Sequence, residues 1–179
     1  MLCLFKIIIM KKTIFILSVI FSVTFTESLI AQGTIVDVAI GNKDFSTLVT
    51  ALKSADLVSA LQGKGPFTVF APTNDAFAKI DSETLNSLLE EKNKKVLSNI
   101  LTYHVISGKL AASDVVAALK KGNGSVELTA LNGQVITVVQ KDGKIWLQDS
   151  KGNYSEISAT DVMGSNGVIH VIDTVVMPE

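Results

Sequence analysis

Apolar residues in the first half of the chain recur at helical spacing. A stripe formed by Phe45, Leu48, Val49 and Leu52 predicts a helix with Asp44 as its N-cap. Residues 56–61 are expected to continue this helix briefly until Gly63 and Gly65 stop it. Similar stripes predict a helix capped by Asp81-Ser82 and running to 89, and another covering 96–101. A last helix is expected to start at Ser113 or Asp114 and to stop at Gly122. This half is therefore mainly helical.

The second half has the period-2 pattern of strands. β-branched runs predict strands at 125–130, 134–140, 145–149, 154–159 and 168–176, with hairpin turns at Asn132-Gly133 and Asp142-Gly143. Two further strands, at 67–70 and 103–106, interrupt the helical half. Helices in one block and hairpins in another indicate an α+β domain instead of alternating βαβ units.

The first thirty residues have the pattern of an export signal. Lys11 and Lys12 precede an apolar run from Thr13 to Phe25, which is shorter than the about 20 residues a membrane span needs. We expect residues 1–31 to be removed as a signal peptide, with 1–9 as an upstream extension and cleavage after Ala31. The remaining 32–179 form one domain, which is exported to the periplasm, the cell surface or the medium, with no stable membrane insertion after cleavage. The lysine-led signal is typical of bacteria.

Composition excludes several functions of the mature chain. The only cysteine, Cys3, precedes the signal, so 32–179 has no disulfide, thiolate ligand or cysteine nucleophile. After Ala31 the chain has 13 lysines, no arginine and 16 acidic residues, a net charge of −3. Without a basic excess or an arginine fork, nucleic acid is not an expected partner.

Few side chains could support catalysis or bind a cofactor. His104 and His170 are the only histidines, and their spacing does not match a metal site. The segment 149–153 has Lys151 where a calcium loop needs an oxygen ligand. Phosphate-binding and nucleophile-elbow motifs are absent from the sequence, although a Ser-His-Asp site assembled from distant positions stays open. We expect no enzyme activity, no metal and no cofactor.

Three segments carry a family resemblance. They are Phe67-Thr68-Val69-Phe70-Ala71-Pro72-Thr73-Asn74-Asp75-Ala76-Phe77, the pair Tyr103-His104, and Asn166-Gly167-Val168-Ile169-His170-Val171-Ile172-Asp173. In this order they resemble the fasciclin domain, and the resemblance covers about 34–179. It implies a wedge-shaped β-sandwich with a helical layer, built here mainly from the N-terminal half, and a role in adhesion instead of catalysis.

The residues that mark this fold also have a structural interpretation. Phe67, Phe70 and Phe77 are expected in the core, whereas Thr73, Asn74 and Asp75 are expected to cap a helix at the Pro72 corner. His170 lies in a nearly continuous apolar strand and is expected to be a hydrogen-bonded interior residue.

Three positions are candidates for partner binding. The resemblance links Tyr103-His104 to receptor binding, with burial in a strand as the favoured alternative. Period-2 alternation places Trp146 opposite Ile145 and Leu147, as an exposed platform for a sugar or a partner side chain. Cover for a strand edge or a neighbouring helix is the favoured alternative.

The third candidate, Asp161-Val162-Met163, lies just before the turn into the final strand and resembles an Asp-Ile-Met segment used by some animal fasciclin domains in integrin recognition. A structural role in capping the turn is the favoured alternative.

The leading functional hypothesis is therefore a secreted or surface adhesion module that binds an extracellular protein or polysaccharide. A secreted hydrolase with an unrecognised site and a self-associating structural matrix component are the alternatives. An enzyme should bring His104 or His170 next to a carboxylate and a hydroxyl.

Overall fold

The computed structural model describes residues 33–179, so the expected signal peptide at 1–31 lies outside the described residues. The helices are α2 (Ile35–Gly41), η1 (Lys43–Phe45, 3₁₀), α3 (Ser46–Ser54), α4 (Val58–Leu61), α5 (Asn74–Ala78), α6 (Ser82–Leu89), η2 (Glu91–Asn93, 3₁₀), α7 (Lys94–Tyr103) and α8 (Ala112–Lys121). The strands are β1 (Phe67–Pro72), β2 (Val105–Ser107), β3 (Ser125–Thr129), β4 (Val135–Lys141), β5 (Lys144–Gln148), β6 (Tyr154–Gly164) and β7 (Gly167–Ile172).

Strands of the described part form one mixed sheet in the order β2-β1-β7-β6-β5-β4-β3. Its second half is the expected antiparallel meander, whereas β1 and β7 run parallel and pair Phe70 with His170. The sheet curves so that its two ends meet. Ile106 of β2 bridges Ala130, just after β3, and the Leu131 N–H donates to the Val105 carbonyl at 2.8 Å. The fold class is therefore α+β, as the sequence indicated.

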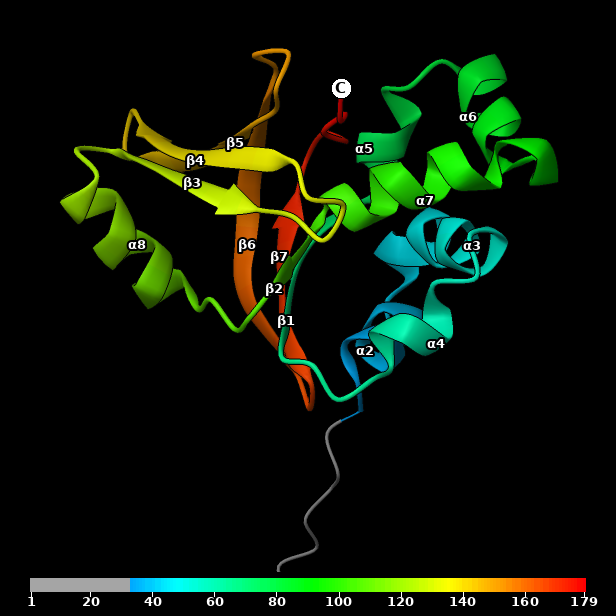
Figure 1. The fold of residues 1–179 in the computed structure, drawn as a ribbon, viewed down its shortest axis with the longest axis horizontal. Helices are drawn as coiled ribbons and strands as arrows, with labels where there is room; N and C mark the ends of the chain where they lie inside the picture. Colours follow the sequence, from blue (N-terminus) through cyan, green and yellow to red (C-terminus); the bar gives the residue numbers. More distant parts are fainter. Residues whose placement is uncertain (1–32) are drawn as a thin grey trace, which may run out of the picture. The chain divides into compact units, whose positions relative to one another are not determined.

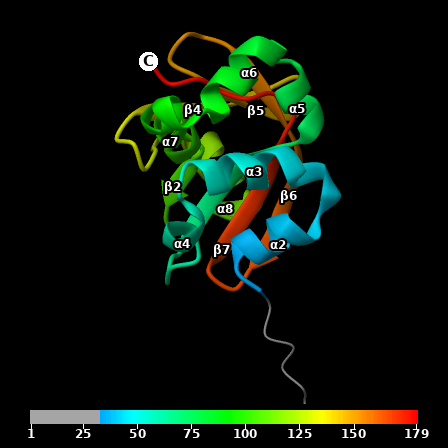
Figure 2. The same ribbon diagram turned by 90° about the vertical axis from the view of Figure 1, so that its right-hand side faces the viewer.

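Two apolar cores lie on opposite faces of β1 and β7. Helices α2 to α7 stand on one side of these strands, and β3, β4, β5 and α8 stand on the other (Figure 1). Seen from the helical side, α2 and α3 lie in front of β6 and β7 (Figure 2). Val69 and Ile169 join the helical core, whereas Phe70 and Ile172 join the core under the meander. Burial on both faces explains why β1 and β7 read as continuous apolar runs.

The structure corrects several expected boundaries. Tyr103 ends α7 and His104 is its C-cap, so the strand expected at 103–106 begins only at Val105. Asp44 lies within η1, where Asn42 is the N-cap, instead of capping the long helix. The last strand ends at Ile172. The strand expected at 154–159 extends to Gly164 as β6, so residues 161–163 are part of this strand and lie just before the turn, as expected.

Candidate functional site

The segment after β1 is a capping structure that links two helices. The Ala76 N–H donates to Thr73 Oγ1 at 3.2 Å, which makes Thr73 the N-cap of α5. Asn74 reaches across to α3, where its Oδ1 accepts from the Thr47 N–H at 3.0 Å. Phe70 and Phe77 are buried. The capping role expected at the Pro72 corner is confirmed for Thr73. Asn74 instead bonds to the start of α3, and Asp75 lies exposed in the first turn of α5.

Tyr103 and His104 are buried and bound to the backbone. The Tyr103 hydroxyl donates to the Val135 carbonyl at 2.9 Å. His104 Nδ1 lies 2.8 Å from the Ile100 carbonyl oxygen, and its Nε2 accepts from the Val176 N–H at 3.3 Å, so the proton is on Nδ1. Burial lowers the pKa of His104 to about 4, and the hydrogen bond to Ile100 offsets part of this effect. At neutral pH this pair offers a partner neither a charge nor a free polar atom.

His170 is the interior residue that the sequence indicated. Only 1% of it is exposed, and its ring lies 5.7 Å from that of Phe70. Its Nε2 lies 2.8 Å from the Leu110 carbonyl oxygen, and its Nδ1 accepts from the Asp161 N–H at 3.4 Å. Both ring nitrogens therefore bond to the backbone, and no carboxylate in the described part of the chain bonds to this histidine.

Asp161 connects a bulge in β6 to helix α8. The residue has φ of 59° at a register shift between Ala159 and Val162. Its Oδ1 accepts a hydrogen bond at 2.9 Å from the backbone N–H of Ala112, the first residue of α8. Val162 packs against the helical core, and Met163 is half-buried. This geometry favours the structural alternative for the segment, because the carboxylate is already engaged.

Trp146 lies on the outer face of the meander, where it lines a shallow hollow. Its cross-strand neighbours are Val139 in β4 and Glu156 in β6. The hollow has a volume of about 150 Å³ and is lined by Lys141, Asp142, Trp146 and Tyr154. Tyr154 is 47% exposed, and the buried indole N–H of Trp146 has no acceptor among residues 33–179. Of the sequence candidates, this one combines exposed aromatic surface with unused polar groups.

Asn166 was not among the expected functional or structural residues, although it begins the closing family segment and lies in a predicted turn. Its Nδ2 donates to the carbonyls of Leu61 at 2.8 Å and Gly63 at 2.7 Å, and its Oδ1 accepts from the Ile35 N–H at 2.9 Å. This buried amide thus ties the β6–β7 turn to α2 and α4. Its place in the Asn-Gly turn and in the closing family segment were the available signals, and neither indicated its partners, which are more than 100 residues away.

The structural role of Thr68 was also not predicted, because its hydrogen-bond partners are about 40 residues away in the sequence. It is fully buried in β1, where its hydroxyl donates to the Gly108 carbonyl at 2.7 Å and accepts from the Leu110 N–H at 2.9 Å. A lone hydroxyl between Phe67 and Val69 was the signal, because a buried threonine needs partners. The residue holds the connection between β2 and α8.

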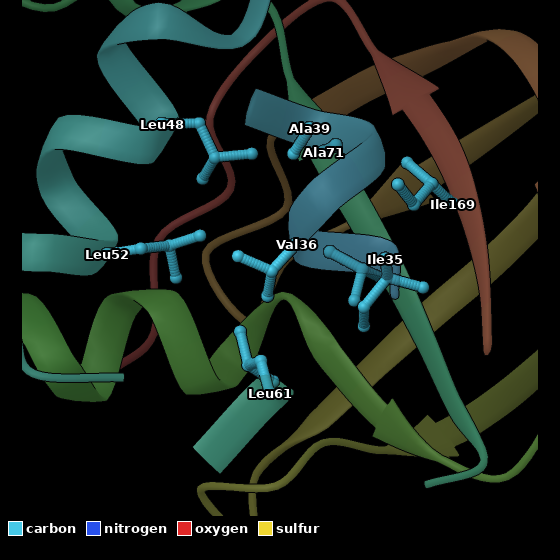
Figure 3. Close-up of a pocket in the computed structure, with 9 residues that line it drawn as sticks. Ile35, Val36, Ala39, Leu48, Leu52, Leu61, Ala71 and Ile169 are labelled. Atoms are coloured by element: carbon cyan, nitrogen blue, oxygen red, sulfur yellow. The ribbon is translucent and has the colours of Figure 1, made fainter. Parts of the chain in front are cut away.

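An apolar pocket lies among α2, α3, α4, β1 and β7, with Leu48, Leu52 and Val36 pointing into it (Figure 3). Its volume of about 20 Å³ is close to that of one water, and its walls carry only aliphatic side chains. It is a packing defect instead of a ligand site. Within residues 33–179, no group of three or more acidic or histidine side chains could hold a metal, and no helix is long and apolar enough to cross a membrane.

Sequence comparisons relate this chain to one family of known proteins. A model of the fasciclin domain matches residues 43–178. The chain is 51% identical over 145 residues to protein sll1483 of Synechocystis sp., an alignment covering 81% of this chain and 73% of that protein. It is 38% identical over 147 residues to the transforming growth factor-beta-induced protein ig-h3 of Sus scrofa, covering 82% of this chain but only 20% of that protein.

A solved structure shows the same fold. It is a FAS1 domain pair from the insect cell adhesion molecule fasciclin I, with a TM-score of 0.69 at 20% identity. The match covers 80% of this chain and 50% of that one. The family model and the Synechocystis relative span most of residues 33–179, and so the chain belongs to the fasciclin domain family.

Proposed function

We propose that this protein is an exported, non-catalytic adhesion module that binds an extracellular protein or polysaccharide. Membership of the fasciclin domain family supports the proposal, because a fold neighbour belongs to an insect cell adhesion molecule. The expected signal at 1–31 supports export to the periplasm, the cell surface or the medium.

The observation that carries the proposal is the engagement of both histidines in the interior. A hydrolase of the Ser-His-Asp type needs a histidine that reaches a nucleophile and is oriented by a carboxylate. His104 and His170 use their ring nitrogens on backbone groups instead, and the nearby Asp161 carboxylate bonds to the Ala112 N–H. The hydrolase alternative therefore has no support from these two residues.

A self-associating matrix component is the second candidate, and one feature favours it. Within residues 33–179, strand β3 pairs with β4 alone, and a single bridge joins Ile106 to Ala130, the residue that follows β3. Its outer edge offers backbone groups to a strand from a second copy. Concentration-dependent sedimentation of 32–179 tests this candidate.

Binding to extracellular material tests the main proposal. Purified 32–179 is incubated with matrix isolated from the producing organism, and bound protein is measured after washing. Parallel samples of matrix are treated beforehand with protease or with periodate, which destroys vicinal diols of sugars. We expect retention on untreated matrix and loss of retention after one of the two treatments. Equal recovery from matrix and from inert beads would contradict the proposal.

A further inference from the structure

The hollow beside Trp146 combines two aromatic side chains with two charged ones. Lys141 and Tyr154 each lie diagonally across one strand from Trp146, because Val139 and Glu156 are its direct neighbours. Asp142 has φ of 54° in the turn that joins β4 to β5, which holds it at the rim of the hollow. The β4–β5 hairpin and the start of β6 therefore place all four side chains around one depression.

The indole N–H of Trp146 has an unmet need for an acceptor. It is buried without a hydrogen-bond partner among the described residues, an arrangement that native structures rarely leave unexplained. Lys141, which lines the same hollow as Trp146, has a long and exposed side chain that can move aside for a ligand. A hydroxyl oxygen entering the hollow would then accept from this N–H.

Charges around the hollow balance. Lys144 forms an ion pair with Glu156 at 2.7 Å, and Lys141 and Asp142 provide one charge of each sign. A polyanion would gain nothing from such a surface. Neutral hydroxyl groups, in contrast, can both donate to the Asp142 carboxylate and accept from the Lys141 ammonium.

The size of the hollow also limits its occupant. Pockets for drug-sized molecules start at about 300 Å³, and this one has about half that volume. One sugar ring fits such a space, with its apolar face against an aromatic side chain and its hydroxyls toward polar neighbours. Specific protein partners require about 800 Å² on each side, which this hollow alone does not provide.

We propose that the hollow formed by Lys141, Asp142, Trp146 and Tyr154 is a binding subsite for one residue of a neutral polysaccharide. This inference rests on the proposed adhesion function and specifies its ligand class. The site contacts the sugar through the rings of Trp146 and Tyr154, and Asp142 and Lys141 select for its hydroxyl groups. Repeated sugars along a polymer would raise the avidity of a surface carrying many copies.

The chain contains a single tryptophan, so intrinsic fluorescence reports directly on this hollow. Purified 32–179 is titrated with soluble neutral oligosaccharides of glucose, of galactose and of mannose. We expect a saturable change in Trp146 emission with at least one series. Salt at about 0.5 M should have little effect on this change, because a neutral ligand forms no ion pair with the protein. Equilibrium dialysis of the same oligosaccharide measures binding independently of the fluorescence.

Two variants locate the site. Tyr154→Ala keeps the fluorescent reporter and should weaken oligosaccharide binding about tenfold, whereas Val96→Ala, at an exposed position on α7, should leave it unchanged. Melting temperatures of both variants establish that the fold is retained. Asp142→Asn provides a second test in which volume is preserved and binding should still weaken.

The outcomes separate this inference from the proposed function. If the protein is retained on matrix but binds none of the oligosaccharides, the subsite is wrong and adhesion stands. The same conclusion follows if Tyr154→Ala is retained on matrix as well as the parent protein. Loss of matrix retention after protease but not after periodate would assign a protein ligand and likewise overturn the subsite. If the protein does not bind matrix at all, the proposed adhesion function is wrong.

Discussion

The backbone N–H of Ala112 donates to Asp161 Oδ1 at 2.9 Å, joining the start of α8 to a bulge in β6 across 49 positions of sequence. Asp161 also has a positive φ of 59°, which Asp and Asn tolerate better than other side chains. The residue therefore supports the fold in two ways, by capping a helix and by occupying a left-handed position.

This relationship predicts the order of stabilities in a variant series at Asp161. Asp161→Ala should lose about 1–2 kcal/mol of unfolding free energy, because the cap disappears and alanine is strained at this φ. Asp161→Asn should stay within about 0.5 kcal/mol of the parent, since the amide oxygen still accepts from Ala112. Urea denaturation measures both values. If Asp161→Ala is as stable as Asp161→Asn, the capping role is wrong.

Burial of His104 predicts a loss of stability in mild acid. The folded protein keeps His104 neutral down to about pH 4, whereas a histidine in the unfolded chain has a pKa near 6.5. The unfolded state therefore binds the proton first as pH falls. The contribution of His104 is intact above pH 6.5 and decreases between 6.5 and 4, by up to roughly 3 kcal/mol.

The matched variant is His104→Gln, which keeps hydrogen-bonding groups but does not titrate. Its absolute stability is expected to be lower, because the two backbone contacts to Ile100 and Val176 are perturbed. The informative quantity is the difference between the two proteins as a function of pH, measured by urea denaturation from pH 7 to 4. A difference that does not shrink toward pH 4 would contradict a buried neutral His104.

The hydrogen bonds of Asn166 predict a large loss of stability on substitution, although the sequence pattern at this position is that of an ordinary turn. Asn166→Ala removes three hydrogen bonds and leaves buried backbone groups of Ile35 and Leu61 without their partner. We expect a loss of about 3 kcal/mol, whereas Ser165→Ala at the exposed neighbouring position should change stability by less than about 0.5 kcal/mol. Thermal unfolding of the two variants side by side provides the comparison, and similar melting temperatures would contradict it.

Local patterns predicted the elements of the fold better than their ends. The Asp142-Gly143 hairpin was predictable because a two-residue hairpin turn requires positive φ at both positions, which Asp and Gly tolerate and have here. The end of α7 was not, because no glycine or proline separates Tyr103 from the β-branched residues that follow. The helix continues to Tyr103, where burial of the side chain under the meander and its hydrogen bond to the Val135 carbonyl stabilise the last turn.

Long-range partners limited what the sequence could indicate about the site. Asp161 looked like a turn residue because its partner Ala112 belongs to another element. Trp146 was correctly placed on the face opposite Leu147, since alternation alone determines this. Its grouping with Tyr154 could not be predicted, because it depends on the register between β5 and β6.

Export predicts a defined N-terminus. Because Lys11, Lys12 and the apolar run to Phe25 form a complete signal, protein recovered from outside the cytoplasm should begin near Gln32. Intact-mass analysis of that protein determines the cleavage point. A mass that includes residues 10–31 would exclude signal cleavage.

The most direct measurement of the central claim is a binding isotherm of 32–179 on isolated extracellular matrix, with the supernatant analysed for released sugars and peptides. A non-catalytic adhesion module should bind saturably and leave the amount of soluble material unchanged over the incubation. Absence of saturable binding, or release of fragments in proportion to added protein, would contradict the account.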